Sequence, residues 1–301
     1  MIALLTALWP LFALIVGGYA LRRLDFPGEA FWPAAERLNY FLLFPALLFS
    51  SLASAPLDNP ALPRLALAVL LGLGAGWLGL LLVRRLRGWN AARFGAFTQG
   101  LLRFNTYLGL AAVGSLFGRE GLTLAALMLA LMVPAVNLMA VWALTAERGV
   151  SLRGLLGPVA RNPLILACLG GALFNLAGGS LGGGSDRLLN LLSAASLPLG
   201  LLCVGAALRP RELAGAAAAL GWNCGLRLLA MPLLAWAVAL LLQLPTLERG
   251  VLVLFFALPT APTAYVLTRQ LGGDSQLMAG LITLQTLLAA LSLPLLLTLL
   301  G

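Results

Sequence analysis

The sequence of 301 residues contains no histidine and no lysine, and charged side chains make up only 10% of it. Soluble globular proteins carry about 25% charged and about 45–50% apolar residues. Here 61% of the residues are hydrophobic and the mean hydropathy is +1.00. The composition therefore excludes a soluble globular chain and predicts a polytopic membrane protein.

The missing histidines and the positions of the acidic residues also limit the chemistry. All ten Asp and Glu residues fall in loops or at predicted helix ends. A serine nucleophile needs a base beside it, so we expect neither an enzyme nor a cofactor or metal centre. Proton-coupled carriers use intramembrane carboxylates or imidazoles, and a dedicated proton-binding carboxylate is therefore not expected. Coupling to Na⁺ stays open, because Na⁺ binds carbonyl and hydroxyl oxygens such as those of Thr260, Thr263, Gln285 and Thr286.

Ten apolar runs are separated by charged residues or by segments rich in Gly and Pro. They lie near 2–21, 38–55, 65–83, 94–117, 121–144, 163–178, 187–208, 214–242, 250–270 and 276–300. A membrane-spanning helix needs roughly 20 apolar residues. We therefore predict an all-α polytopic membrane protein with ten transmembrane helices and no room for a soluble domain.

The 19 basic residues are all arginines and give a net charge of +9. Loops after odd-numbered helices hold twelve of them, including Arg148 and Arg153, whereas loops after even-numbered helices hold four. Because cytoplasmic loops are enriched in basic residues, we expect both termini on the periplasmic or extracellular side of a bacterial inner membrane. Arginines scattered over helix ends, without one basic patch, also argue against nucleic-acid binding.

The two halves of the chain share residues that shape the backbone. A shift of 153 residues superimposes Pro10 on Pro163, Gly17-Gly18 on Gly170-Gly171 and Pro45 on Pro198. Each half then has five helices, an odd number, so the second half must be inverted relative to the first. Inverted repeats are typical of transporters, whose substrate site lies near the membrane midplane. We predict two inverted five-helix repeats, residues 1–150 and 151–301.

Polar residues interrupt the centre of the fourth run at Arg103, and two prolines, Pro259 and Pro262, interrupt the ninth. Proline removes a backbone donor and clashes with the preceding turn, so the ninth helix should break there. Helix amino ends together with a guanidinium at mid-membrane indicate an anion site. The alternative is that Arg103 only ties down carbonyl groups of the broken neighbouring helix. Arg227 in the eighth run is a second candidate, with an uncertain depth in the membrane.

Several motifs resemble the bacterial auxin efflux carrier family over almost the whole chain. They are Arg103-Phe104-Asn105-Thr106-Tyr107-Leu108-Gly109, Leu116-Phe117-Gly118-Arg119-Glu120-Gly121, Asn162-Pro163-Leu164-Ile165, Pro198 to Leu208, Pro259-Thr260-Ala261, Tyr265 and Gly272-Gly273-Asp274. The resemblance implies that broken helices 4 and 9 cross at a central site, with Asn105, Thr106, Pro259, Thr260 and Pro262 at the crossing. It also implies transport of small organic anions, such as auxin-like, malate-like or malonate-like carboxylates, and a homodimer. Plant PIN-type carriers have proline at the position of Phe104. Whether the fourth helix breaks as sharply as the ninth is therefore a question for the structure.

These observations together predict a secondary carrier of organic anions that works by alternating access. A cation/proton antiporter or a sodium-coupled organic anion symporter on the same scaffold is the alternative, and the missing intramembrane carboxylates argue against the antiporter. The expected partners are the small anion, the lipid bilayer and a second copy of the chain. The candidate substrate-binding residues are Arg103, Asn105, Thr106, Tyr107, Pro259, Thr260, Pro262, Thr263 and Arg227.

Overall fold

The computed structural model describes residues 2–55, 60–147, 157, 160–214 and 216–300, which fold into helices with no strand among them. Arg148, Arg153 and the predicted boundary between residues 150 and 151 lie outside these ranges. The elements are α1 (Ile2–Arg23), α2 (Phe31–Leu38), the π-helical η1 (Asn39–Leu43), α3 (Phe44–Ala53), α4 (Leu62–Arg87), α5 (Ala91–Leu102), α6 (Thr106–Thr145), α8 (Pro163–Leu176), α9 (Ser185–Ala206), the 3₁₀-helical η2 (Pro210–Ala214), α10 (Ala217–Gly225), the π-helical η3 (Leu226–Ala230), α11 (Met231–Leu241), α12 (Thr246–Ala257), α13 (Thr263–Gln270) and α14 (Ser275–Leu300).

Each of the ten apolar runs is helical, and the fourth and ninth are interrupted near their centres. In the ninth run α12 ends at Ala257 and α13 begins at Thr263, which confirms the break predicted from the prolines. The fourth run is also broken, since α5 ends at Leu102 and α6 begins at Thr106. The fourth and fifth runs are joined through a kink in α6 at Gly118, whose φ of 61° favours glycine.

Six helical stretches are long and apolar enough to cross a membrane. They are Leu4–Arg23, Leu62–Arg87, Ala91–Thr145, Ser185–Ala206, Ala217–Leu241 and Ser275–Leu299. The stretch Ala91–Thr145 covers both the fourth and the fifth run. The other three runs are not among them: the sixth forms the 14-residue α8, the ninth is divided between α12 and α13, and the second is formed by α2, η1 and α3. The prediction of an all-helical membrane protein is thus confirmed for the described residues.

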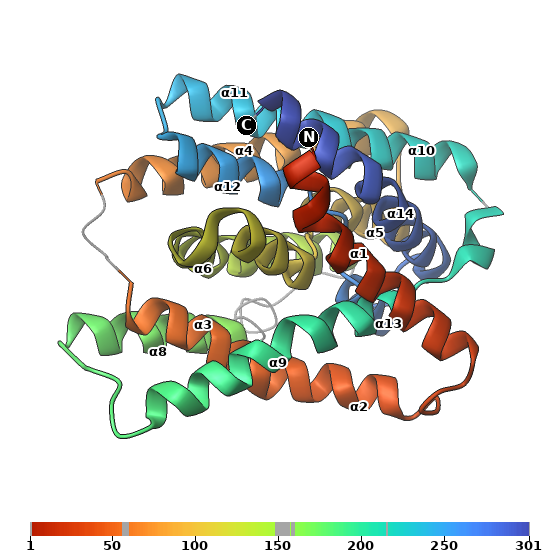
Figure 1. The fold of residues 1–301 in the computed structure, drawn as a ribbon. Coiled ribbons are helices and arrows are strands. Elements are labelled where there is room, and N and C mark those ends of the chain that lie inside the picture. The colour runs from red at the N-terminus through yellow and green to blue at the C-terminus, as the bar shows by residue number, and fades with distance from the viewer. Residues whose placement is uncertain (1, 56–59, 148–156, 158–159, 215, 301) are drawn as a thin grey trace.

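Helices of the two halves of the chain pack closely together. Figure 1 shows α2, α3, α8 and α9 in one layer, α4, α11, α12 and α14 in another, and α6 between them. In the contact of α1 with α9, a Cβ at Gly18 would overlap the backbone oxygen of Leu202. In the contact of α3 with α8, a Cβ at Gly171 would overlap the backbone oxygen of Phe49. Leu202 follows Phe49 by 153 residues and Gly171 follows Gly18 by the same 153, so the two glycines make equivalent contacts.

Candidate functional site

The breaks in the fourth and ninth runs meet inside the protein. The backbone amide of Asn105 donates a hydrogen bond of 2.8 Å to the carbonyl oxygen of Pro259. Around this contact, residues 103–105 and 258–262 are not helical. A helix that ends leaves its last carbonyl groups without backbone partners. Both α5 and α12 end here inside the protein, so side chains must supply the missing donors.

Arg227 of η3 supplies donors on the side of the crossing where α5 and α12 end. Its side chain is 1% exposed. Nε donates to the carbonyl oxygen of Leu258 at 2.6 Å, Nη1 to that of Leu101 at 2.7 Å and Nη2 to that of Phe255 at 3.2 Å. A positive charge is also favourable beside helix carboxyl ends. Arg227 is therefore bonded to backbone groups inside the protein and does not line the cavity described below.

The broken backbone explains why these three carbonyl groups need an arginine. In a continuous helix each carbonyl accepts from the amide four residues later. For Phe255 and Leu258 that residue is proline, at positions 259 and 262, and proline has no N–H. For Leu101 it is Asn105, whose amide is bonded to Pro259 instead. One planar guanidinium with five N–H donors replaces all three missing bonds.

A buried polar network holds the rest of the ninth break. The backbone amide and the hydroxyl of Thr260 both lie 2.8 Å from Oε1 of Gln285 on α14. Nε2 of Gln285 donates to the carbonyl oxygen of Gly100 at 2.9 Å and to Oδ1 of Asn223 at 2.9 Å. The hydroxyl of Thr286 donates to the carbonyl oxygen of Ile282 at 2.7 Å. Thr260, Gln285 and Thr286, three of the four residues named for a Na⁺ site, thus have bonding partners inside the protein.

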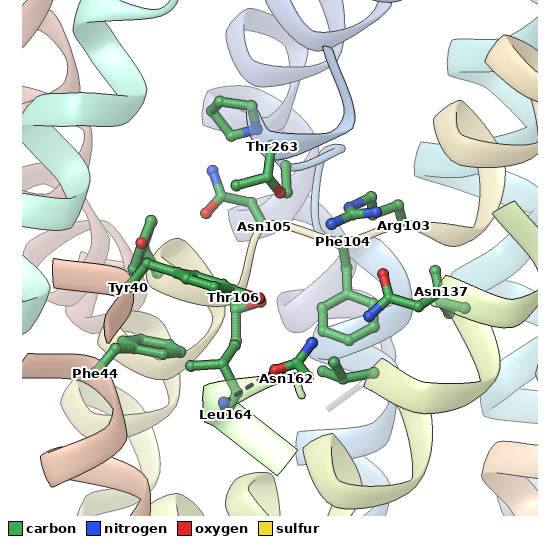
Figure 2. A pocket seen from close by; sticks show the side chains of 15 residues that line it. Tyr40, Phe44, Arg103, Phe104, Asn105, Thr106, Asn137, Asn162, Leu164 and Thr263 are labelled. Atoms are coloured by element: carbon green, nitrogen blue, oxygen red, sulfur yellow. Dashed lines mark hydrogen bonds between the residues drawn. The ribbon is translucent and has the colours of Figure 1, made fainter. Parts of the chain in front are cut away.

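A cavity lies on the side of the crossing where α6 and α13 begin (Figure 2). Six of the nine candidate residues line this cavity, which we call the candidate substrate cavity: Arg103, Asn105, Thr106, Tyr107, Pro262 and Thr263. Pro259 and Thr260 belong to the crossing itself, and Thr260 is completely buried. The structure therefore brings the candidates of the fourth run together with the beginning of α13 and leaves Pro259, Thr260 and Arg227 behind the cavity.

Among the described residues, the guanidinium of Arg103 has one hydrogen-bonding partner, and the bond is long. Its Nη1 lies 3.5 Å from Oε1 of Gln99, one turn earlier on α5. Gln99 is fixed in turn, because its Nε2 donates to the hydroxyl of Thr268 at 2.6 Å. The described residues that line the cavity include no Asp or Glu. The positive charge of Arg103 is therefore available to a ligand in the cavity.

Two more polar groups of the cavity are buried without a partner among the described residues. Asn105 caps α6, since its Oδ1 accepts from the backbone amide of Leu108 at 3.1 Å, but its Nδ2 has no acceptor. The hydroxyl of Tyr107 is likewise unpaired. Buried polar groups are normally hydrogen-bonded. The unpaired amide donor of Asn105, which lines the same cavity as Arg103, is thus suited to a ligand that carries acceptor oxygens.

Five polar or aromatic lining residues were not among the candidates: Tyr40, Phe44, Phe104, Asn137 and Asn162. In Figure 2, Arg103 and Asn137 lie on one side of the cavity and Tyr40 and Phe44 on the other. The ring of Phe44 packs edge-on against that of Tyr107, with centroids 4.9 Å apart. An asparagine inside an apolar run, as at position 137, is a signal that sequence reasoning can use, whereas Tyr40 and Phe44 give no such signal.

Comparisons with known proteins agree with a membrane transporter. Residues 150–297 match the family described as membrane transport protein. An uncharacterized transporter of Methanothermobacter thermautotrophicus is 30% identical to this chain over 290 residues. The matched region covers 94% of this chain and 93% of that transporter, so the similarity extends over both halves.

Proposed function

Because the chain belongs to the membrane transport protein family, which is the auxin efflux carrier family that its motifs resemble, we propose that it is a secondary carrier of small organic anions. The proposed substrates are auxin-like, malate-like or malonate-like carboxylates. The carrier exposes a site at the crossing of the broken helices to one side of the membrane at a time. Transport, rather than an enzymatic reaction, is the activity that this site serves.

The proposal rests on which helix ends lie on each side of the crossing. The carboxyl ends of α5 and α12 are neutralised by Arg227, whereas α6 and α13 begin at the candidate substrate cavity. A helix amino end carries about half a unit of positive charge. The amino ends of α6 and α13 and the guanidinium of Arg103 are all positive, and the described lining contains no acidic residue. The cavity therefore favours the binding of an anion. A carboxylate can accept two parallel N–H bonds from a guanidinium and a further one from Nδ2 of Asn105.

The candidate residues then divide into two roles. Arg103, Asn105, Thr106, Tyr107, Pro262 and Thr263 line the cavity and are proposed to contact the substrate. Pro259, Thr260 and Arg227 hold the backbone of the crossing through the bonds described above. Phe44 and Phe104 add apolar lining, which suits a substrate with a hydrophobic part next to its carboxylate.

The proposed architecture has ten membrane spans in two inverted repeats, residues 1–150 and 151–301. The equivalent contacts of Gly18 with Leu202 and of Gly171 with Phe49 support it, because two halves related by a twofold axis exchange such contacts. A twofold axis in the membrane plane would relate the five helices of the first repeat to the five of the second, in keeping with the shift of 153 residues between matching positions. Dimerisation through a second copy of the chain is part of the same proposal.

The direction in which the cavity faces follows from the same topology. Asn162, which caps the amino end of α8, lines the cavity. The arginine count places this end of α8 in the cytoplasm of a bacterial cell and both termini outside. The cavity then faces the cytoplasm. Each negative charge that leaves through a potential of 100 mV, negative inside, gains about 2.3 kcal/mol, so export of an anion needs no coupled ion.

Flux measurements in proteoliposomes test the proposal. Labelled mono- and dicarboxylates are followed under a K⁺ diffusion potential of either sign, with and without a Na⁺ gradient. We expect at least one carboxylate to move in the direction set by the potential. Arg103→Ala should abolish this flux, while Arg119→Ala, which removes an exposed arginine outside the candidate substrate cavity, should retain it. The proposal fails if no carboxylate moves, if Arg103→Ala matches the wild type, or if flux requires Na⁺.

A further inference from the structure

A second cavity lies away from the crossing, where α1 ends and η2 begins. Four of its nine lining residues are arginines, and two segments far apart in sequence supply them. Arg22 and Arg23 form the last turn of α1, while Arg209 and Arg211 lie at the start of η2. These four residues define what we call the arginine groove.

Tyrosine rings and a backbone carbonyl hold the guanidinium groups of the groove. Nε of Arg23 donates to the hydroxyl of Tyr19 at 3.0 Å, and its guanidinium lies 5.3 Å from the centre of that ring. Arg209 makes the same kind of contact with Tyr265 of α13, at 3.2 Å to the hydroxyl and 4.6 Å to the ring centre. Arg22 donates to the carbonyl oxygen of Ala206. These contacts orient the side chains and leave their charges uncompensated.

The groove has an excess of positive charge. Two carboxylates, Glu29 and Glu212, lie among its lining residues and face four arginines. In the part of the chain that the structure describes, no carboxylate oxygen lies within the 4.0 Å of an ion pair with any of these four arginines. Arginine is suited to phosphate, because its planar fork donates two parallel N–H bonds to two phosphate oxygens.

Exposed apolar side chains follow the two arginines where α1 ends. Leu24 and Phe26 are 76% and 62% exposed. Because α1 is long and apolar enough to cross a membrane, its last turn and this apolar pair are expected at the depth of the lipid headgroups. Basic pockets between helices on the cytoplasmic side bind anionic headgroups, and the arginine count places the end of α1 on that side.

We propose that the arginine groove binds the phosphate group of an anionic membrane phospholipid, with Arg22, Arg23, Arg209 and Arg211 around the phosphate and Leu24 and Phe26 at the adjoining headgroup level of the bilayer. Free inorganic phosphate offers the same oxygen atoms but no acyl chain. The groove is separate from the candidate substrate cavity, and this binding does not depend on the proposed transport activity.

The experiment uses the full-length protein purified in a neutral detergent and three probes. These are short-chain phosphatidylglycerol, short-chain phosphatidylcholine and inorganic phosphate, each titrated while the melting temperature is measured. A ligand that binds only the folded protein raises that temperature. Arg23→Gln/Arg211→Gln removes two arginines of the groove. Arg85→Gln/Arg87→Gln, at the exposed end of α4, removes the same charge outside the groove and is the matched control.

We expect phosphatidylglycerol to stabilise the wild type at concentrations at least tenfold lower than phosphatidylcholine or inorganic phosphate. Arg23→Gln/Arg211→Gln should weaken the phosphatidylglycerol response about tenfold or more, while the control pair retains it. Equal losses in both double variants would show unspecific attraction to a basic surface and overturn the proposal. Retained binding in Arg23→Gln/Arg211→Gln would also overturn it. An equal response to inorganic phosphate would overturn the lipid as the occupant.

Discussion

Arg103 and Arg227 lie at the same crossing of two broken helices, and they have opposite surroundings. Arg227 donates to three backbone carbonyl oxygens and is completely enclosed by protein. Arg103 lines the cavity at the crossing, and the one side-chain hydrogen bond that it makes to a described residue, Gln99, is 3.5 Å long. Helix carboxyl ends surround Arg227, whereas Arg103 lines the cavity at which α6 and α13 begin. One arginine therefore completes the backbone, and the other gives the cavity its charge.

Replacing Arg227 should destabilise the protein. Arg227→Met keeps much of the side-chain volume but leaves three buried carbonyl groups unpaired, and each such group costs about 1–3 kcal/mol. We expect a fall of the melting temperature by at least 10 °C in detergent, or loss of folded protein on size-exclusion chromatography. Arg227→Lys should recover only part of the loss, because one ammonium group cannot match the planar fork. A melting temperature equal to the wild type for Arg227→Met would contradict this role.

Replacing Arg103 should reduce transport while leaving stability almost unchanged. A hydrogen bond to a charged group contributes about 1.5–3 kcal/mol, and every 1.4 kcal/mol corresponds to a factor of ten in affinity. We therefore expect Arg103→Ala to lower carboxylate flux at low substrate concentration by about tenfold or more. Its melting temperature without substrate should remain within about 3 °C of the wild type. A large loss of stability with normal affinity in the remaining folded protein would show that Arg103 is structural.

The residues alone predict the ninth break, whereas the fourth break is implied only by the family resemblance, and the reason lies in the backbone. Pro259 and Pro262 remove donors within the ninth run, and that is a local property. The fourth run has Phe104 at its centre and no proline. Its break depends on a tertiary contact, because the amide of Asn105 bonds to Pro259, which lies more than 150 residues later. The lining by Tyr40 and Asn137 comes from other runs, and no spacing within one run reveals it.

The same limit applies to the two intramembrane arginines. Either one is a candidate for binding an anion or for holding carbonyl groups, since both are cations in apolar runs. The three acceptors of Arg227 lie 28, 31 and 126 residues away in sequence. Only the folded chain places them around one guanidinium. The existence of a charged site was therefore predictable, whereas the division of roles between the two arginines was not.

Asn105 allows helix capping and substrate binding to be separated. Asn105→Asp keeps an oxygen that can accept from the backbone amide of Leu108, so α6 should remain capped. The change replaces the unpaired Nδ2 donor by a carboxylate in a cavity proposed to bind anions. We expect less than a tenth of the wild-type flux with a melting temperature within a few degrees. Asn90→Asp is the control, because Asn90 caps α5 in the same way and does not line the cavity. Wild-type flux in Asn105→Asp would contradict the proposed contact.

The close contacts of Gly18 and Gly171 give a test of the repeat. A methyl group at either position would overlap a backbone oxygen of the neighbouring helix, and such overpacking typically costs about 1–3 kcal/mol. A backbone oxygen, unlike a side-chain atom, cannot rotate away from the added methyl group. We expect Gly18→Ala and Gly171→Ala to lower the melting temperature by similar amounts, since the two contacts are equivalent. Gly79→Ala on α4 is the control, because a Cβ there meets no atom within 4 Å. If only one of the two variants is destabilised, the halves are not related as proposed.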